Sequence, residues 1–227
     1  MSILERWIQE KDLFLFDFDG LLVDTERLHF EAYQKMCRAR GFALPWSFTE
    51  YASLAHTGSD HVKKGVYELF PQLKLQEPNW FVLHKEKQEA FLEILEKKGA
   101  VLMPGVEILL NKLHKKGVAF CVVTHSPSSL TKAIQYFHKV FDTVSFWVTR
   151  EMYKNPKPFP DSYFKAVELH GCSKKDCVGF EDTYRGWQAL RAAEIESCVV
   201  SSLLSVQVKR LISEGKSHCF NSFVDLL

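Results

Sequence analysis

The sequence lacks several features that mark whole classes of protein. No apolar run approaches the roughly 20 residues that span a bilayer, and the N-terminus, MSILERWIQEKD, carries charges where a signal peptide needs an uninterrupted apolar stretch. The 29 basic residues nearly balance the 28 acidic ones and are scattered through helical patterns, which disfavours nucleic-acid and membrane partners. We therefore expect a soluble, cytoplasmic monomer with no nucleic acid or membrane as a partner.

The six cysteines form no C-x-x-C pair, and the nine histidines show no ligand spacing typical of a zinc site. Cys121 and Cys198 lie inside apolar, strand-like runs, where a thiol behaves as a small buried hydrophobe. The sequence also lacks an internal repeat and a low-complexity tract. We expect reduced, structural cysteines, so the chemistry must come from other residue types.

Short apolar runs alternate with helical patterns over much of the chain. A continuous apolar run is typical of a strand that is covered on both faces of a parallel sheet. Strands that alternate with helices indicate an α/β fold with a doubly wound parallel sheet. The strand candidates are residues 11–20, 118–124, 176–182 and 196–202, and the helical patterns are 105–116, 127–138, 159–170 and 183–193.

Residues 24–102 interrupt this alternation, because they show helical spacing of apolar residues and no convincing strand. The clearest helical stretches are residues 29–40, 60–70 and 84–98. We predict a helical subdomain at 24–102, inserted into a core domain made of residues 1–23 and 103–227. The expected hinges lie near residues 22–26 and 99–104.

In the stretch FLFDFDGLLVDTE an apolar run ends in three aspartates, Asp17, Asp19 and Asp24, which lie within eight residues. Carboxylates this close repel one another unless a cation lies among them, and burial adds to the cost. If the strand continues through Asp17 and Asp19, both point the same way at its carboxyl end, and Gly20 permits a sharp turn. A hard divalent cation such as Mg²⁺ would remove the repulsion. The alternative is an acidic turn before a helix, with Asp24 or Thr25 as N-cap, and for Asp24 we favour that interpretation.

Three later segments carry polar residues that complement these carboxylates. Thr124 ends the second strand candidate, with Ser126 just beyond it, and Glu181 and Asp182 end another. Lys157 lies between two prolines, which restrict the backbone and lower the cost of holding the ammonium in place. A loop lysine is usually only solvated, but one beside an acidic site is a suitable counter-charge.

The four motifs together resemble those of the haloacid dehalogenase superfamily. The strings DFDGLLVDTERLH, KPFPDSY and GFEDT are most similar to its β-phosphoglucomutase and phosphoglycolate phosphatase branch. The resemblance implies a Rossmann-like core with an inserted helical cap, Mg²⁺ as the cofactor and a small phosphorylated molecule as the substrate. It extends over nearly the whole chain, strongly in the core motifs and weakly in the cap.

The resemblance also implies a role for each matching residue. Asp17 would be the nucleophile that forms an aspartyl-phosphate, and Asp19 the general acid and base. An intact D-x-D pair favours phosphate over carbon–halogen chemistry, because dehalogenation needs no leaving-group acid. The implied phosphate-binding residues are Thr124, Lys157, Gly20 and His125, and the implied metal ligands are Asp17, Asp19 through its backbone carbonyl, Asp182 and Glu181.

The cap distinguishes two reactions within the branch. Mutases carry a K-G-x-S-R string there, whereas the matching HTGSDH keeps Gly58 and Ser59 but has Thr57 in the lysine's place and His61 near the arginine's. This departure favours a phosphatase over a phosphomutase. The cap candidates for substrate contact are His29, Tyr33 and His61, and Lys63 and Lys64 are further candidates.

Two non-enzymatic alternatives remain. A phospho-acceptor receiver also uses an acidic pocket, a threonine and a lysine on a doubly wound sheet, but it needs neither a leaving-group acid nor a substrate lid. A non-catalytic binding protein would not need a competent residue at every motif position. We therefore predict a Mg²⁺-dependent phosphatase that acts on a small phosphorylated metabolite.

Overall fold

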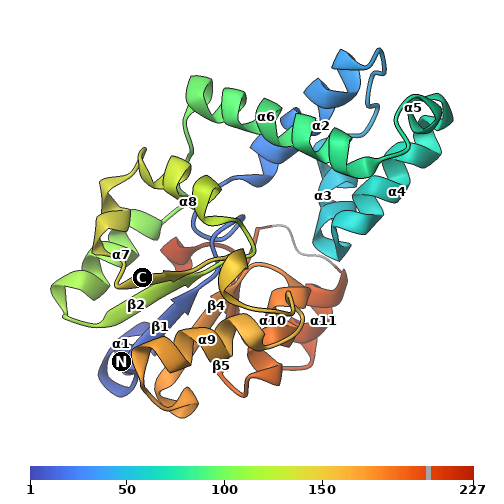
Figure 1. Ribbon diagram of the computed structural model, residues 1–227. Coiled ribbons are helices and arrows are strands. Elements are labelled where there is room, and N and C mark those ends of the chain that lie inside the picture. The colour runs from blue at the N-terminus through green and yellow to red at the C-terminus, as the bar shows by residue number, and fades with distance from the viewer. Residues whose placement is uncertain (203–205) are drawn as a thin grey trace. The chain divides into compact units, whose positions relative to one another are not determined.

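The computed structural model describes residues 1–202 and 206–227, without the side chains of Ser59, Val206 and Gln207. Ser59 of the HTGSDH string therefore has its side chain outside the described part. The chain divides into two compact units (Figure 1). The first comprises Met1–Asp24 and Val101–Leu227, and the second comprises Thr25–Ala100.

Six parallel strands form the centre of the first unit, in the order β3-β2-β1-β4-β5-β6. This arrangement confirms the predicted α/β parallel sheet. The strands are β1 Leu13–Phe16, β2 Ala119–Val123, β3 Phe146–Val148, β4 Cys177–Glu181, β5 Glu196–Val200 and β6 His218–Phe220. The α-helices of this unit are α1 Ile3–Glu10, α7 Val106–Lys115, α8 Ser128–Gln135, α9 Asp161–His170, α10 Tyr184–Ala192 and α11 Val206–Ser213.

The central strand β1 is apolar throughout because both of its faces are buried. Leu13 and Leu15 belong to a core that α9 and α10 share on one side of the sheet (Figure 1). Phe14 and Phe16 point to the other side, where the ring of Phe180 stacks with them at centroid distances of 5.8 and 4.8 Å. Full burial of each such side chain stabilises the fold by about 1.5–3 kcal/mol. The LFLF run therefore specifies a covered strand.

The strand order places the predicted site at one edge of the sheet. From β1 the chain builds β2 and β3 on one side, and β4, β5 and β6 on the other. Open parallel sheets bind ligands beyond the carboxyl ends of the strands at such a switch point. Asp17 follows β1, Thr124 follows β2 and Glu181 ends β4, so three distant segments meet there.

β1 ends at Phe16, one residue before Asp17. The strand therefore does not continue through Asp17 and Asp19, so the condition under which strand alternation would align them is not met. The backbone N–H of Asp17 still donates to β4, at 3.0 Å, whereas Asp19 forms an isolated bridge with Val23. Between Asp19 and Val23 the chain turns at Gly20, with φ at 80°. The two carboxylates are thus positioned by different backbone conformations.

Four of the six strands lie where the apolar runs predict them, but β3, β6, α1 and α11 match no predicted element. β3 and β6 have three residues each, which is too short for a periodic signal. The helix α1 is amphipathic, and its buried Trp7 packs edge-on against Phe180 at 5.6 Å. Tertiary packing accounts for these elements better than local pattern does.

The second unit contains five helices that pack around an aromatic core. Tyr33, Tyr51 and Leu83 are among its buried residues, and α2 packs lengthwise against α6. The three predicted helical stretches match α2, α4 and α6 to within one residue at their carboxyl ends, whereas α3 and α5 were not separately predicted. The helices are α2 Glu26–Ala39, α3 Phe48–Thr57, α4 Ser59–Leu69, α5 Pro71–Gln76 and α6 Trp80–Lys98.

The two connections to the helical unit run beside each other in the first unit. The N–H of Asp24 donates to the carbonyl of Val101 at 2.8 Å, and Val23 forms a bridge with Leu102. Thr25, not Asp24, occupies the N-cap position of α2. The prediction that Asp24 caps this helix is therefore wrong, because its backbone belongs to the paired connection.

The cysteines are all free, and Cys121 and Cys198 are buried in strands as expected. The Sγ atoms of Cys172 and Cys177 lie 3.3 Å apart.

Among the described residues, no helix combines the length and the apolar character needed to cross a membrane.

Candidate active site

Lys157 lies at the centre of the candidate site. Its Nζ atom is 2.6 Å from Oδ1 of Asp17, 2.7 Å from Oε1 of Glu181 and 2.9 Å from the carbonyl oxygen of Val123. An ammonium has three donors, and these three acceptors can use all of them. Residues that are far apart in the sequence therefore meet through one buried cation.

The electrostatics of this group follow from its burial. Burial raises the pKa of Asp17 above the usual carboxyl value, and Glu181 adds to this effect while Lys157 opposes it. For Lys157, burial alone would lower the pKa, but Asp17 and Glu181 outweigh it and raise the pKa above its ordinary value. Lys157 therefore remains charged and offsets part of the negative charge.

Asp17, Glu181 and Asp182 form an acidic cluster. Each offers a carboxylate oxygen, and these oxygens all lie within 4.8 Å of one another. Hard divalent cations prefer oxygen ligands, so the donor type fits Mg²⁺. The charge balance fits as well, because Lys157 supplies only one positive charge among three buried carboxyl groups. The side chain of Asp19 is not a member of this cluster.

Two hydroxyls hold the side chain of Asp19 at the same edge of the sheet. Thr124 Oγ1 donates to Oδ2 of Asp19 at 3.1 Å, and Ser126 Oγ donates to the same oxygen at 2.7 Å. The backbone N–H of Ser126 in turn donates to Thr124 Oγ1 at 2.9 Å. The sequence placed Ser126 only beyond the strand end, so its contact with Asp19 is new information from the fold.

His125, predicted to bind phosphate, is joined to Tyr153. The hydroxyl of Tyr153 donates to the carbonyl of Thr124 at 2.9 Å, so Nδ1 of His125 is the donor in its 3.2 Å contact with that hydroxyl. Burial of the ring, and then the positive charges of Arg150 and Arg185, lower the pKa of His125 to about 4. The imidazole is thus neutral at neutral pH and adds no positive charge to the site.

Two residues that contact this group received no role from the sequence. The hydroxyl of Tyr163, on α9, donates to Oε1 of Glu181, and Nε of Arg185, on α10, donates to the carbonyl of Lys157. The string KPFPDSY contains Tyr163, but only the docking of α9 against β1 and β2 shows that it reaches Glu181. Nothing in the local pattern separates it from an ordinary core aromatic.

The helical unit contains a second polar group. Nζ of the buried Lys87 lies 2.8 Å from Nδ1 of His29, and 5.0 Å from the ring centroid of Tyr33. Burial first, and then Lys87, lower the pKa of His29 well below its usual value. His29 and Tyr33 are thus brought together, with Lys87 as a partner that the sequence did not reveal. The other candidates, His61, Lys63 and Lys64, are exposed on α4.

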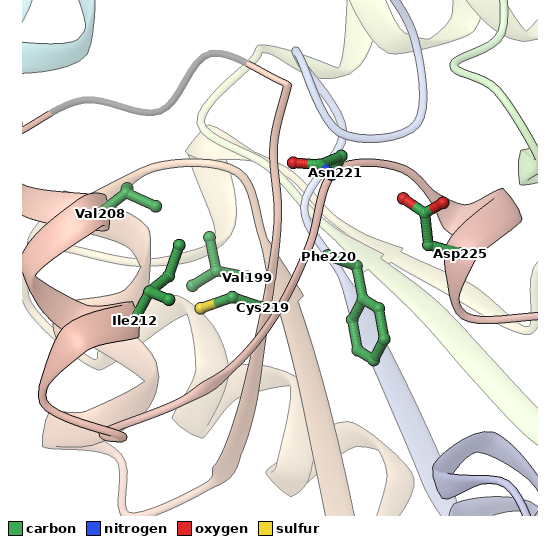
Figure 2. Close-up of a pocket in the computed structure, with 7 residues that line it drawn as sticks. All are labelled: Val199, Val208, Ile212, Cys219, Phe220, Asn221 and Asp225. Carbon is green, nitrogen blue, oxygen red and sulfur yellow. The ribbon is translucent and has the colours of Figure 1, made fainter.

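A pocket of about 160 Å³ lies elsewhere in the first unit, between α11 and the carboxyl ends of β5 and β6 (Figure 2). Val208 and Ile212 of α11 face Val199 and Cys219 across it, while Asn221 and Asp225 lie at its polar side. It shares no residue with the acidic cluster.

The chain matches the family model of haloacid dehalogenase-like hydrolases over residues 14–200. It is 32% identical over 216 residues to a probable pseudouridine-5'-phosphatase of Drosophila melanogaster, a match that covers 90% of this chain and 85% of that protein. It is 30% identical over 190 residues to a phosphorylated carbohydrates phosphatase of Thermotoga maritima, covering 80% of this chain and 81% of that protein.

A solved structure shows the same fold. The β-phosphoglucomutase of Clostridium difficile superimposes with a TM-score of 0.73 at 20% identity, over 96% of this chain and 93% of that one.

Proposed function

Because the chain belongs to the haloacid dehalogenase-like hydrolase family, in its branch of phosphatases and phosphoglucomutase-like proteins, we propose that it is a Mg²⁺-dependent phosphatase of a small phosphorylated metabolite. The observation that carries this proposal is the contact of Lys157 with both Asp17 and Glu181, at 2.6 and 2.7 Å, inside an acidic cluster. Phosphoryl transfer requires neutralisation of oxygen charge as well as in-line positioning, and the buried Lys157 ammonium supports the first requirement.

In the first step, an oxygen of Asp17 attacks the phosphorus atom of the substrate, and the bond to the leaving oxygen breaks. Asp17 becomes an aspartyl-phosphate, and Asp19 gives its proton to the leaving oxygen. The hydrogen bonds of Thr124 and Ser126 to Oδ2 of Asp19 support this role, because they orient the carboxyl group.

In the second step, Asp19 takes a proton from water, and the resulting hydroxide attacks the phosphorus of the aspartyl-phosphate. Free phosphate leaves and the carboxylate of Asp17 is restored. Asp19 thus acts as the acid in the first step and as the base in the second, so one nucleophilic aspartate and one proton-transferring aspartate suffice.

Asp17, Asp182 and the backbone carbonyl of Asp19 are the proposed Mg²⁺ ligands, with Glu181 beside them. When bound, Mg²⁺ supplies positive charge to the phosphoryl oxygens and to the nucleophile. Lys157 adds the second positive charge. The proposed phosphate contacts are Lys157, the hydroxyl of Thr124, and the backbone at Gly20 and His125.

The names of the two curated relatives support a phosphorylated carbohydrate or nucleoside as the substrate class. We assign the helical unit the role of a cap that excludes bulk water during the reaction. Its candidates for substrate contact are His29 and Tyr33, with Lys87 added from the structure, and the exposed His61.

The test measures free phosphate released from a panel of sugar phosphates, phosphoglycolate and nucleotides, with Mg²⁺ and with EDTA. We expect Mg²⁺-dependent release that Asp17→Asn abolishes. The matched control is Asp12→Asn, an exposed carboxylate at the amino end of β1, which should retain wild-type release.

Two results would redirect the proposal. If a sugar phosphate is isomerised on addition of catalytic bisphosphate while little phosphate appears, the protein is a phosphomutase. If a phosphorylated protein persists for minutes after mixing with a phosphodonor, it is a phospho-acceptor.

A further inference from the structure

Tyr163 contacts the candidate site from inside the core. Its side chain is fully buried on α9, and its hydroxyl donates to Oε1 of Glu181. Its ring also faces the cation, because Nζ of Lys157 lies 5.1 Å from the ring centroid. Tyr163 therefore contacts two members of the group, Glu181 and Lys157.

Two donors converge on one oxygen of Glu181. Lys157 Nζ lies 2.7 Å from Oε1, and the Tyr163 hydroxyl donates to the same atom. Glu181 is only 1% exposed, so it cannot replace a lost donor with bulk water. Without the hydroxyl, the carboxylate would have to satisfy Oε1 through Lys157 alone, which would draw the ammonium toward Glu181 and away from Asp17.

Gly186 of α10 packs closely against the carboxylate of Glu181. A Cβ atom at Gly186 would lie 1.9 Å from Oε2 of Glu181, a distance that no real contact reaches. Glycine at this position of α10 therefore leaves room for the carboxylate. The hydrogen bond from Tyr163 and the close approach of Gly186 both restrict the position of the Glu181 side chain.

From this geometry we propose that Tyr163 is a positioning residue of the phosphoryl-transfer site: it shares the charge of Glu181, so that Lys157 stays in contact with Asp17. The inference rests on the proposed phosphatase function. The purely structural alternative is that Tyr163 only fills the core beside Leu15 and Val123. The two explanations predict different results when the hydroxyl is removed: a positioning role lowers kcat and Mg²⁺ affinity, whereas a purely structural role leaves both unchanged.

The main test is Tyr163→Phe, which keeps the ring and removes the hydroxyl. We expect kcat to fall by about tenfold or more, because a hydrogen bond to a charged group is lost. The KM of the substrate should stay within about twofold. Calorimetric titration of the metal-free protein should show weaker Mg²⁺ binding, because Glu181 belongs to the acidic cluster.

The matched control is Tyr67→Phe. The Tyr67 hydroxyl donates to the carbonyl of Glu77 at 2.8 Å in the helical unit, so this variant also loses a tyrosine hydrogen bond. It should leave kcat and Mg²⁺ affinity unchanged. A double-mutant cycle with Glu181→Gln then shows whether Tyr163 acts through Glu181, since the effect of Tyr163→Phe should shrink in that background.

A second variant tests the position of the Glu181 carboxylate through Gly186. Gly186→Ala should displace the carboxylate and lower kcat and Mg²⁺ affinity in the same direction. If Tyr163→Phe lowers only thermal stability and leaves kcat and Mg²⁺ affinity at wild-type values, the proposal is overturned and the role is structural.

Failure of the proposed function would be recognised separately. In that case the wild type releases no phosphate from any compound in the panel. The comparison of Mg²⁺ binding between wild type and Tyr163→Phe then still decides the role of Tyr163: weaker binding supports it and equal binding refutes it.

Discussion

Ser126 Oγ lies 2.7 Å from Oδ2 of Asp19, although the two residues are 107 positions apart in the chain. Thr124 Oγ1 donates to the same carboxylate oxygen at 3.1 Å. A carboxyl group that must deliver a proton along one direction benefits from such fixed partners. The segment after β2 therefore orients the side chain of Asp19, the proposed general acid.

Ser126→Ala should lower kcat by about tenfold, since one hydrogen bond to a charged group is lost while that of Thr124 remains. Mg²⁺ affinity should be unchanged, because the Asp19 side chain lies outside the acidic cluster. Steady-state kinetics and calorimetry on the same preparation measure both. The control is Ser128→Ala, whose hydroxyl contacts Glu151 instead. Equal kcat values for Ser126→Ala and wild type would contradict the orienting role.

The sequence predicted the parallel sheet because strands covered on both faces leave a signal that needs no tertiary information. The LFLF run of β1 is one such signal, and the strand order then brings Asp17, Thr124 and Glu181 to one edge. Lys157 was also recognisable, because flanking prolines single it out from solvated lysines. These features are local in the chain, and their meeting point follows from the parallel topology.

Tyr163 and Lys87 could not be recognised in this way. Each lies in a helical pattern where an aromatic or a lysine is ordinary, and only helix packing brings Tyr163 to Glu181 and Lys87 to His29. Asp24 was misassigned for a related reason. Its backbone pairs with Val101, which lies 77 positions later in the chain, and no local cap signal encodes that contact.

Lys157→Met should reduce both activity and stability. It removes the cation from a group of three buried carboxylates, and loss of one partner of a buried pair costs about 3–5 kcal/mol of unfolding free energy. Urea unfolding in EDTA measures this cost. Mg²⁺ should restore more stability to this variant than to the wild type, because the uncompensated negative charge is larger.

The comparison for Lys157 is Lys165→Met. Lys165 forms an i,i+3 pair with Glu168 at the surface, and exposed pairs contribute about 0–1 kcal/mol. If both lysine variants lose the same small amount of stability, the buried group does not depend on Lys157 as described.

Mg²⁺ should stabilise the wild-type protein against heat. At about a hundredfold excess over its Kd, a ligand of the folded state adds about 2.7 kcal/mol, which corresponds to an increase in Tm of about 5–10 °C for a chain of this size. Asp182→Asn should reduce the shift, whereas Asp12→Asn should retain it. Sodium chloride at matched ionic strength serves as the control for screening. A shift of equal size in Asp182→Asn would place the cation elsewhere.

His56 should make the stability of the protein sensitive to acid. Its Nε2 atom is buried without a hydrogen-bond partner among the described residues, and burial lowers its pKa below 6.5. As the pH falls through 6.5, the unfolded chain takes up a proton at His56 while the folded protein still resists it. The unfolded state then binds more protons, so the free energy of unfolding decreases until the pH reaches the folded-state pKa.

His56→Gln removes this titration while keeping a polar side chain of similar size. We expect the difference in unfolding free energy between about pH 7.5 and about pH 5.5 to be smaller in His56→Gln than in the wild type. Urea titrations at both pH values measure it, and His61→Gln, at an exposed position of the same unit, should behave like the wild type. The pH-dependent change in unfolding free energy of the variant is subtracted from that of the wild type, so contributions from other carboxyl and imidazole groups cancel. If His56→Gln and the wild type lose the same stability in acid, burial of His56 does not set this pH dependence.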